Sequence, residues 1–470
     1  MSKIIGIIGW GSYIPSLRLP LTDLAKARNV DPKKYLKGLI LEKMALPQPY
    51  EDAVTMAFEA AKNALDRSKV NPEDIGIVVV GTESKPYSVK SVAGIIKDLL
   101  GCSPYAYVGD YDAACAGGIQ AIVTCAAFIK SGLAKFGLAV ASDISEYEFY
   151  HPGEPTQGAG AAAFVIGKGN VDVSIENFVA YSTDTNDFFR RSEERYPFVY
   201  GHFSEEAYLE HVIKTHEKIV STRSPKPDYY AFHLPFGKMA LKASKRIGLD
   251  DEEVERKVKP SFEVVKATGN QYAASILNVV IHFLENMVNV GERIEAISYG
   301  SGAQSIGIIF KVEHDLKKKV NLAPTLNHYL RKSKLVDVKY YEQRRRNLKE
   351  KPLIFGKIEP NSTNGVKRFI CENCGMLLSP YTIKKCPRCY EKGENFRLRE
   401  IFYPFKAKLL SFEETEKDVF EEMLKGKIRI LEEETENLKV GMDLKLKVIK
   451  LKVEGKNGLI HYGPAYEKQE

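Results

Sequence analysis

Residues 75–84, IGIVVVGTES, and residues 112–118, DAACAGG, are the two stretches that decide the fold. The first is an apolar run rich in Ile and Val that ends in a polar loop, which is the pattern of a buried strand. The second opens the Ala-rich apolar stretch 115–134, which is typical of a buried helix. A strand, a loop and a buried helix in this order predict an α/β layered fold.

The same alternation continues along the chain in two sets. In the first set we expect further strands at residues 4–9, 136–143 and 161–167 and an amphipathic helix at 52–68. In the second set we expect a strand at 229–235, helices at 237–248 and 269–287, and a strand pair with a Gly-rich turn at 295–312. Two sets of similar pattern indicate an internally duplicated fold, with an N-terminal half at residues 1–170 and a C-terminal half at 171–355.

Composition limits the class of protein. A chain of 470 residues is long enough for two or three domains, and 44% hydrophobic with 27% charged residues is the balance of a soluble globular protein. The first residues lack the apolar run of a signal peptide, and we expect no later stretch to reach membrane-spanning length. We therefore expect a cytoplasmic protein. The net charge of +7 suits small anionic ligands and is too diffuse to favour nucleic acid.

The C-terminal region has a different composition. From about residue 314 to residue 352 the chain is basic, and we interpret it as the partly helical end of the first domain with a linker, bounded by PNSTNG at 360–365. Further on, apolar and charged residues alternate with period two at 405–412, 426–433 and 442–453. This alternation indicates half-exposed strands, and we expect a small β-barrel at residues 396–470.

A cluster of cysteines precedes the expected barrel. The sequence CENCGMLLSPYTIKKCPRC contains two C-x2-C pairs, formed by Cys371, Cys374, Cys386 and Cys389. Each pair makes a tight turn that directs two sulfurs to one side, and four thiolates complete a tetrahedral zinc site. The alternative is four reduced cysteines without metal. We predict a zinc ribbon at residues 366–395, with a structural role because four cysteines leave no open coordination position.

Cys115 is the candidate nucleophile. DAACAGG places it where a strand passes into a helix, and the partial positive charge of a helix N-terminus is expected to stabilise a thiolate and lower its pKa. The small neighbouring residues would let a substrate carbonyl approach the backbone, so that the N–H of Cys115 could help hold an oxyanion. Most cysteines in Ala-rich helices are simply part of the core, and Cys102 and Cys125 fit that interpretation.

Three further residues are candidates because of where they lie. His233 and Glu83 each follow an apolar strand, and strand ends in α/β folds are where side chains converge on ligands. Asn270 precedes an apolar helix and could direct its amide at a substrate carbonyl. The alternatives are a hydrogen-bonded loop histidine, a solvated or N-capping glutamate and an N-capping asparagine. The histidines at positions 202, 211, 216 and 282 have the pattern of surface or helix-packing residues.

Seven motifs in order resemble the thiolase superfamily and, within it, the 3-hydroxy-3-methylglutaryl-CoA (HMG-CoA) synthase family in its archaeal form. The resemblance covers roughly residues 3–350, and its motifs are GTES at 81–84, DAACAGG at 112–118, EPTQGAGAAAFVI at 154–166, STDTNDFFR at 182–190, AFHLPFGKM at 231–239, GNQYAAS at 269–275 and SYGSG at 298–302. It implies a thiolase-like duplicated α/β layered fold and an enzyme that condenses acetyl-CoA with acetoacetyl-CoA in the mevalonate route to isoprenoids.

The resemblance also implies roles for single residues. Cys115 would carry the acetyl group, Glu83 would remove a proton from its methyl group, and His233 would protonate the developing alkoxide. The backbone N–H groups of Cys115 and Ser301 would form the oxyanion hole, and Asn270 would position acetoacetyl-CoA.

The resemblance further implies contacts beyond the reacting atoms. Lys238 and Lys242 resemble the basic residues that meet CoA phosphates, and a homodimer is expected. From about residue 366 the chain resembles the zinc-ribbon and OB-fold protein that, in archaea, bridges this synthase to acetoacetyl-CoA thiolase, here fused to the synthase. A complex with that thiolase is therefore expected.

Two alternatives belong to other classes. A ketoacyl synthase III-type enzyme shares the Cys, His and Asn pattern but forms its carbanion by decarboxylation and has no need of a glutamate at position 83. A scaffold protein would use the OB-like tail to recruit a thiolase or a single-stranded nucleic acid, for which Phe402, Tyr403 and Phe405 could provide stacking surfaces.

Overall fold

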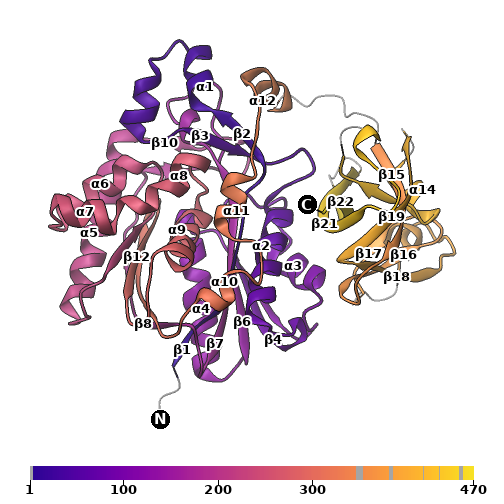
Figure 1. Ribbon diagram of the computed structural model, residues 1–470, viewed down its shortest axis with the longest axis horizontal. Coiled ribbons are helices and arrows are strands. Elements are labelled where there is room, and N and C mark those ends of the chain that lie inside the picture. The colour runs from indigo at the N-terminus through magenta and orange to yellow at the C-terminus, as the bar shows by residue number, and fades with distance from the viewer. Residues whose placement is uncertain are drawn as a thin grey trace. The chain divides into compact units, whose positions relative to one another are not determined.

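The computed structural model describes residues 4–345, 353–380, 385–415, 418–432, 435–454 and 459–469. The chain divides into two compact units, which are considered separately below (Figure 1). The first consists of Met1–Ile96 and Tyr105–Arg346, and the second of Lys97–Pro104 and Asn347–Glu470.

A mixed sheet forms the centre of the first unit. Within residues 4–345 it has nine strands in the order β11-β12-β13-β8-β1-β7-β6-β4-β5. Their bounds are β1 (Ile5–Tyr13), β4 (Ile75–Gly81), β5 (Tyr107–Tyr111), β6 (Phe136–Ile144), β7 (Ala159–Lys168), β8 (Val173–Ser182), β11 (Tyr229–Phe232), β12 (Arg293–Gly300) and β13 (Gln304–Val312).

The pairing of these strands repeats in the two halves of the sheet. In the N-terminal half β4 is parallel to β6, and β7 and β1 follow in antiparallel pairing. In the C-terminal half β11 is parallel to β12, and β13 and β8 follow in antiparallel pairing. The halves join where β1 pairs with β8. The similar pattern of the two sequence sets therefore corresponds to a repeated strand topology.

Helix α2 (Ala53–Ser68) packs on β1, β7 and β6. It begins with a capping box, in which the Asp52 carboxylate accepts hydrogen bonds from the backbone N–H groups of Val54 and Thr55 while the Thr55 hydroxyl accepts one from the N–H of Asp52. The helix lies so close to β1 that a Cβ atom at Gly11 would be 2.2 Å from the carbonyl oxygen of Ala60. Only glycine permits this approach.

Two apolar helices, α4 (Gly117–Ser131) and α9 (Ala273–Asn286), occupy corresponding places in the two halves and pack on each other. A Cβ atom at Gly118 would be 2.5 Å from the carbonyl oxygen of Ala273, so the N-terminal ends of the two helices meet. Each helix directly follows a loop that carries a candidate site residue, Cys115 before α4 and Asn270 before α9. The duplication therefore brings the two loops to one place.

The expectation that no stretch reaches membrane-spanning length is wrong for Ala114–Ser131. Among the described residues this is the single helical stretch long and apolar enough, by length and composition, to cross a bilayer. It includes α4, which packs on β4, β6, β7 and α9. The apolar composition is that of a helix covered by a sheet and a neighbouring helix.

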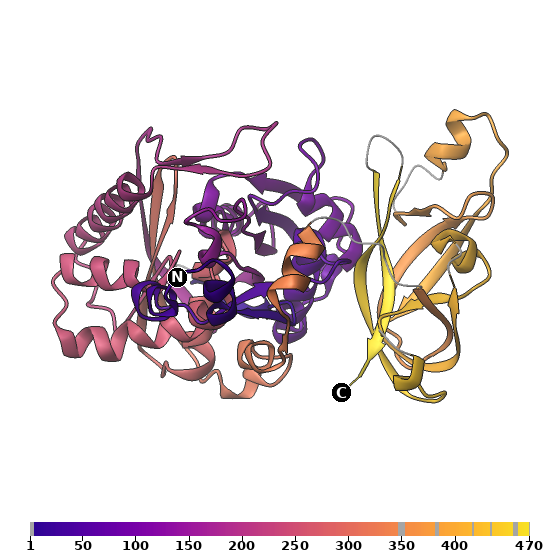
Figure 2. The same cartoon turned by 90° about the horizontal axis from the view of Figure 1, so that it is seen from above.

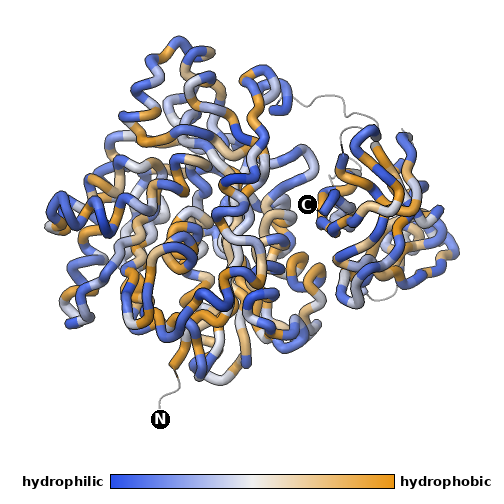
Figure 3. Tube along the Cα trace, in the orientation of Figure 1, coloured by the Kyte–Doolittle hydropathy of each residue, from blue (hydrophilic) through white to orange (hydrophobic). Residues whose placement is uncertain are grey.

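The remaining elements of residues 4–345 surround this core (Figure 2). They are β2 (Leu17–Pro20), β3 (Lys43–Leu46), β9 (Phe188–Phe189), β10 (Phe198–Val199), β14 (Lys334–Leu335), α1 (Leu21–Ala27), α3 (Val92–Leu100), α5 (Gly201–Ser221), α6 (Gly237–Arg246), α7 (Asp251–Lys257), α8 (Phe262–Thr268), α10 (Lys317–Val320), α11 (Leu326–Arg331) and α12 (Val338–Arg345). Figure 3 shows more hydrophilic residues along the outer helices α5 and α7 than along the central α9.

The second unit contains a closed barrel and a small sheet. Among the described residues the barrel strands follow the order β15-β19-β21-β22-β20, and the small sheet has the order β17-β16-β18. The bounds are β15 (Leu353–Pro360), β16 (Gly365–Cys371), β17 (Leu377–Leu378), β18 (Leu398–Pro404), β19 (Lys406–Thr415), β20 (Ile428–Ile430), β21 (Asp443–Glu454) and β22 (Leu459–Lys468), with helices α13 (Pro387–Glu391) and α14 (Val419–Leu424).

This arrangement differs from the expected boundaries at residues 355, 366–395 and 396–470. The stretch before PNSTNG is not linker throughout, because Leu353–Pro360 forms the first barrel strand, β15, which pairs with β19. The cysteine-bearing sheet extends to β18, which ends at Pro404. The sheet is therefore inserted between the first and second barrel strands, a long-range pairing that the local period-two pattern cannot reveal.

Candidate active site

Two glycines bring the GTES loop against the DAACAGG turn. Gly81 ends β4 and Gly117 begins α4, and a Cβ atom at Gly81 would lie 2.2 Å from the carbonyl carbon of Gly117. Backbones can approach this closely only where neither residue has a side chain. The contact places the loop after β4, with Glu83, beside the turn that carries Cys115.

Cys115 lies in the 3-10 turn Ala114–Ala116 that leads into α4, and its side chain is 8% exposed. Its sulfur is 3.3 Å from Oε1 of Glu83, and the thiol donates to the carboxylate. The preceding residue, Ala114, has a φ of +45°, a left-handed conformation that is costly for a residue with a side chain. The hydroxyl of Ser298 in β12 fixes the turn from the other half of the fold by donating to the carbonyl of Cys115 at 3.0 Å.

The pKa of Cys115 is shifted upward, opposite to the direction expected from the sequence. Burial, followed by the charge of Glu83, raises the pKa of the Cys115 thiol well above its usual value. Burial, followed by the charge of Asp143, raises the pKa of Glu83 to about 8. The helix N-terminus therefore does not yield a standing thiolate in this site. The thiol keeps its proton and shares it with a carboxylate whose pKa lies near neutrality.

Asp143 is a site residue that the sequence reading missed. It ends the expected strand FGLAVASD, and its side chain is fully buried. One carboxylate oxygen accepts hydrogen bonds from the Glu83 N–H at 2.8 Å and from the hydroxyls of Thr82 and Ser84 at 3.0 and 2.9 Å. The other accepts the N–H of Ala273, the first residue of α9, at 3.0 Å. Asp143 therefore links the Glu83 loop to the helix that follows Asn270, and its position as a charged residue at the end of an apolar strand was the available signal.

His233 follows β11 and is 1% exposed. Its backbone is held on both sides, because its N–H donates to the carbonyl of Ile297 at 3.0 Å and its own carbonyl accepts the hydroxyl of Tyr208 at 3.0 Å. Its ring atom Nδ1 has no hydrogen-bond partner among the described residues. Burial lowers the pKa of His233 to about 3, so the imidazole is neutral and retains one N–H.

Asn270 is held by a second pair of glycines. A Cβ atom at Gly158 would be 2.8 Å from the carbonyl oxygen of Asn270, and Gly269 has a φ of +73°. The side-chain oxygen of Asn270 accepts the N–H of Tyr272 at 2.9 Å. The alternative of an N-cap is wrong, because Tyr272 occupies that position of α9. The loops before α4 and before α9 are thus fastened in the same way, each by a close glycine contact.

Ser301 lies close to the Cys115 turn because its neighbour Gly300, at the end of β12, contacts that turn. A Cβ atom at Gly300 would be 2.3 Å from the carbonyl oxygen of Ala113 and 2.8 Å from the N–H nitrogen of Ala116. The following turn is held by Asp187, a buried residue that accepts hydrogen bonds from the N–H of Gly302 and the hydroxyl of Tyr299. Ser301 is therefore next to the turn that carries Cys115.

One cavity of about 420 Å³ collects four of the expected residues. Cys115, His233, Asn270 and Ser301 line it together with the aromatic side chains of Tyr147, Phe188, Tyr208, Phe236, Tyr272 and Tyr299. Glu83 joins them through its contact with Cys115. His202, which we expected on the surface or in helix packing, is exposed and lies at the wall of the cavity.

Lys238 and Lys242 are not among the described residues that line this cavity. Both lie on α6, where Lys238 is exposed and Lys242 is paired with Glu205, which does line the cavity. The structure therefore brings the thiol, carboxylate, imidazole and amide together but leaves the two lysines outside the cavity wall.

The four C-terminal cysteines converge within the second unit. Their sulfur atoms all lie within 4.8 Å of one another, and the contacts Cys371–Cys389 and Cys374–Cys386 measure 3.7 and 3.5 Å. Four sulfurs at about 2.3 Å from a central zinc ion would be separated by about 3.8 Å, so this arrangement fits a tetrahedral metal site. Gly375 has a φ of +73°, the conformation that the turn after the first pair requires.

Comparison with known proteins gives the family. The model of the hydroxymethylglutaryl-coenzyme A synthase N-terminal domain matches residues 1–170, and that of the C-terminal domain matches residues 244–351. The hydroxymethylglutaryl-CoA synthase of Methanocaldococcus jannaschii is 36% identical over 348 residues, which are 73% of this chain and 99% of the relative. That of Pyrococcus furiosus is 34% identical over 350 residues, 73% of this chain and 97% of the relative.

Solved structures of the same family are also similar to this chain. The structure of MvaS in complex with 3-hydroxy-3-methylglutaryl coenzyme A superposes with a TM-score of 0.69 at 28% identity, covering 76% of this chain and 96% of that one. A structure of HMG-CoA synthase complexed with CoA gives 0.67 at 29% identity, covering 74% and 91%. These relatives confirm the thiolase-like α/β fold of the first unit. The chain belongs to the hydroxymethylglutaryl-CoA synthase family.

Proposed function

We propose that this chain condenses acetyl-CoA with acetoacetyl-CoA to 3-hydroxy-3-methylglutaryl-CoA, in the mevalonate route to isoprenoids. The observation that carries the proposal is the contact of 3.3 Å between the Cys115 thiol and the Glu83 carboxylate, at a cavity also lined by His233 and Asn270. A nucleophile, a base with a pKa near neutrality and a neutral imidazole are the groups that this condensation needs.

The first step transfers the acetyl group. The Cys115 sulfur attacks the thioester carbonyl of acetyl-CoA, the new C–S bond replaces the bond to the CoA sulfur, and the thiol proton ends on the departing CoA thiol. Cysteine suits this step because thioester exchange conserves the activation of the acyl group. The N–H groups of Cys115 and Ser301 hold the oxyanion, a contribution of about 10²–10³-fold for each such donor.

The second and third steps form and release the product. Glu83 removes a proton from the acetyl methyl group, and the resulting carbon nucleophile attacks the ketone of acetoacetyl-CoA, which Asn270 positions. The alkoxide that forms takes a proton from the His233 imidazole, and the proton that Glu83 removed from the methyl group returns to His233, so that both side chains regain their starting states. Water then hydrolyses the bond to Cys115, which frees the product thioester and restores the thiol. Positioned acid–base groups contribute about 10²–10⁴-fold.

The ketoacyl synthase III-type alternative is disfavoured by the same contact. A decarboxylating enzyme obtains its carbanion from the loss of CO₂ and needs no carboxylate beside the nucleophile. Glu83 is held there by the Gly81–Gly117 contact and by its N–H bond to Asp143.

Mass spectrometry after incubation with acetyl-CoA tests the proposal, with an acetyl group expected on Cys115 and six-carbon product expected once acetoacetyl-CoA is added. Glu83→Ala should retain acetylation of Cys115 and lose condensation, whereas Cys115→Ser should lose both. Condensation that survives in Glu83→Ala would favour the decarboxylating class, and unlabelled Cys115 in the wild-type enzyme would exclude the acetyl-cysteine route.

We further propose that the second unit is a structural zinc ribbon inserted into an OB-like barrel that recruits acetoacetyl-CoA thiolase. The support is the convergence of the four cysteines and the closed five-stranded barrel of the described residues. A bound zinc ion would be held by Cys371, Cys374, Cys386 and Cys389 and would join two chain segments in place of a hydrophobic core. Co-purification with a thiolase that depends on residues 353–470 tests the recruiting role.

The remaining proposals concern localisation, oligomeric state and CoA binding. We propose that the enzyme is a cytoplasmic homodimer and that Lys238 and Lys242 meet CoA phosphates outside the cavity. The position of β5 at the edge of the nine-stranded sheet of residues 4–345, with Tyr107 54% exposed, supports pairing with a second copy.

A further inference from the structure

One wall of the catalytic cavity is a closed loop between β6 and β7. This wall loop, Ser145–Gly158, has its two ends joined, because the N–H of Ser145 donates to the carbonyl of Gly158 at 2.9 Å and the N–H of Gly158 donates to the Ser145 hydroxyl at 2.8 Å. Five of its residues line the cavity, namely Tyr147, His151, Pro152, Gly153 and Thr156. Ω-shaped loops of this kind have neighbouring ends and are packed by their own side chains.

Two buried side chains organise the interior of the wall loop. Gln157 accepts the N–H of Tyr147 at 2.5 Å, and Glu154 accepts the N–H of Tyr150 at 3.0 Å. Gln157 and Glu154 are 2% and 1% exposed. The path of the loop therefore depends on where these two side chains are held.

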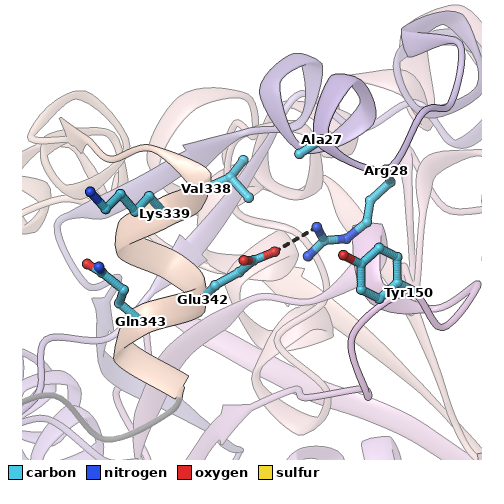
Figure 4. A pocket seen from close by; sticks show the side chains of 7 residues that line it. All are labelled: Ala27, Arg28, Tyr150, Val338, Lys339, Glu342 and Gln343. Carbon is cyan, nitrogen blue, oxygen red and sulfur yellow. Dashed lines mark hydrogen bonds and ion pairs between the residues drawn. The ribbon is translucent and has the colours of Figure 1, made fainter.

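Helix α12 holds both of them from a distant part of the sequence. The hydroxyl of Tyr341 donates to Glu154 at 3.2 Å and accepts the Gln157 amide at 2.7 Å. The next residue, Glu342, pairs with Arg28, which in turn makes two bonds of 2.8 Å to Glu154. Figure 4 shows Glu342 of α12 directed at the Arg28 guanidinium, with the Tyr150 ring beside it.

Arg345, the last residue of α12, makes the most direct connection. Its Nη2 donates to the carbonyl of Tyr147 at 2.5 Å, and its Nη1 donates to the Tyr341 hydroxyl at 2.7 Å and lies 3.5 Å from the Gln157 side-chain oxygen. Its guanidinium also lies over the ring of Phe149, 4.3 Å from the centroid. A single planar group thus contacts the loop near its start, at Tyr147 and Phe149, and near its end, at Gln157.

We propose that Arg345 is a positioning residue that sets the shape of the wall loop and hence the fit of CoA thioesters in the cavity. The inference rests on the proposed function. Arg345 is not among the residues that line the cavity and acts through Tyr147, which lines the cavity together with Cys115 while its carbonyl is bound by Arg345. A guanidinium is required because its fork can donate in two directions while its face stacks on an aromatic ring, and an ammonium cannot do both.

The test compares Arg345→Ala and Arg345→Lys with Arg344→Ala in the full-length enzyme. Arg344 lies on the same helix, but its hydrogen bond goes to the carbonyl of Gln48, outside the wall loop. We expect both Arg345 variants to raise KM for acetoacetyl-CoA by about tenfold, because one or two charge-assisted hydrogen bonds are lost. The change in kcat should be smaller. Low-millimolar guanidinium chloride should lower the KM of Arg345→Ala toward the wild-type value, whereas the same concentration of sodium chloride should not. Guanidinium chloride should leave the KM of Arg344→Ala unchanged.

Amide hydrogen exchange supplies a readout that does not depend on turnover. Residues 145–158 should exchange faster in Arg345→Ala than in the wild type, and at the wild-type rate in Arg344→Ala. Wild-type kinetics and wild-type exchange in Arg345→Ala would overturn the inference, and so would equal effects of the two arginine substitutions. A wild-type enzyme that forms no HMG-CoA would instead overturn the proposed function, and the exchange of the wall loop would still decide the role of Arg345.

Discussion

At the scale of single residues, the reactivity of the site depends on where one proton resides. The Cys115 thiol donates to Glu83, and burial raises the pKa of both groups. The second cause for Glu83 is the negative charge of Asp143, whose own pKa is raised to about 6, mainly by burial. The two carboxylates interact and titrate as a pair, so the site is prepared to gain or lose a proton near neutral pH.

The first prediction follows from this pair. Glu83 acts as a base only when it is deprotonated, and that form is populated above its pKa of about 8. The value of kcat/KM for condensation should therefore rise with pH and level off above about pH 8, and His233 should add no step between pH 5 and 9 because its pKa lies near 3. The measurement is a pH profile of kcat/KM.

Asp143→Asn is the informative variant for this profile. Removing the neighbouring charge should lower the pKa of Glu83 and move the rise in activity to lower pH, even where the absolute rate falls because the bond to Ala273 is weakened. A midpoint that stays near pH 8 in Asp143→Asn would show that burial alone sets the pKa of Glu83.

At the scale of elements, glycine contacts determine which side chains can meet. β4 and α4 touch through Gly81 and Gly117, and the loop before β7 touches the loop before α9 through Gly158 and Gly269. In the second case a Cβ atom at Gly269 would lie 1.9 Å from the carbonyl oxygen of Gln157. Glu83 and Asn270 follow Gly81 and Gly269 by two positions and one position, and Cys115 precedes Gly117 by two, so the placement of these candidate residues depends on the backbones staying in contact.

Gly81→Ala should therefore damage activity more than stability. The added methyl group would overlap the backbone of Gly117, and the adjustment costs about 1–3 kcal/mol while it moves Glu83 away from the Cys115 sulfur. We expect loss of condensation by at least about 10²-fold, since a displacement of about 1 Å can cost that much. Thermal unfolding and steady-state kinetics on the same preparation measure the two effects.

Gly94→Ala is the matched control for this prediction. It lies in α3, where the nearest atoms to an added Cβ are 3.7 Å away in the Ser91 side chain. An alanine there should raise stability by up to about 1 kcal/mol and leave activity unchanged. Full activity in Gly81→Ala would mean that the Glu83 loop adjusts without moving its carboxylate.

At the scale of the whole molecule, the chain combines two units that are stabilised in different ways. The first has a continuous core whose largest fully buried side chains include Trp10, Phe58, Phe164, Phe232 and Phe283. The cysteine-bearing sheet of the second is small, and its buried core cluster consists of Met376 and three of the cysteines, with Cys374 packed against it. Domains of this size usually need a metal or disulfides for stability.

Removal of metal should accordingly act on the second unit alone. We expect a strong chelator, or Cys371→Ser, to release zinc and to lower the temperature of one unfolding transition while a second transition stays in place. Acetylation of Cys115 should persist, because the catalytic cavity of about 420 Å³ is lined by residues 39–301 only. Metal analysis, calorimetry and mass spectrometry on the full-length chain measure these three quantities.

Cys115→Ser is the control for the metal, since it should keep zinc and lose acetylation. Acetylation that disappears on chelation would contradict the assignment of a purely structural metal. A chain purified without zinc would contradict the metal site itself.

Local patterns in the sequence were sufficient for the fold class, the family and the cluster of four cysteines. Alternating strand and helix periodicity predicted the α/β layers, the seven ordered motifs predicted the synthase family, and both are confirmed. Such features can be read locally because periodicity and motif spacing reflect interactions over a few residues. The same reasoning selected Cys115, Glu83, His233 and Asn270 as candidates, each of which lies within two residues of the end of a strand or an α-helix.

Other properties depended on contacts between residues far apart in the chain. The pKa of Cys115 is raised rather than lowered, because burial by surrounding elements and the charge of Glu83 outweigh the helix N-terminus. Asp143 and Arg345 matter because of hydrogen-bond partners up to 198 residues away in the sequence. Strand β15 joins the barrel because it pairs with β19, which follows the inserted sheet in the sequence. Desolvation and charge–charge interaction are set by everything that packs around a group, so only the tertiary structure decided them.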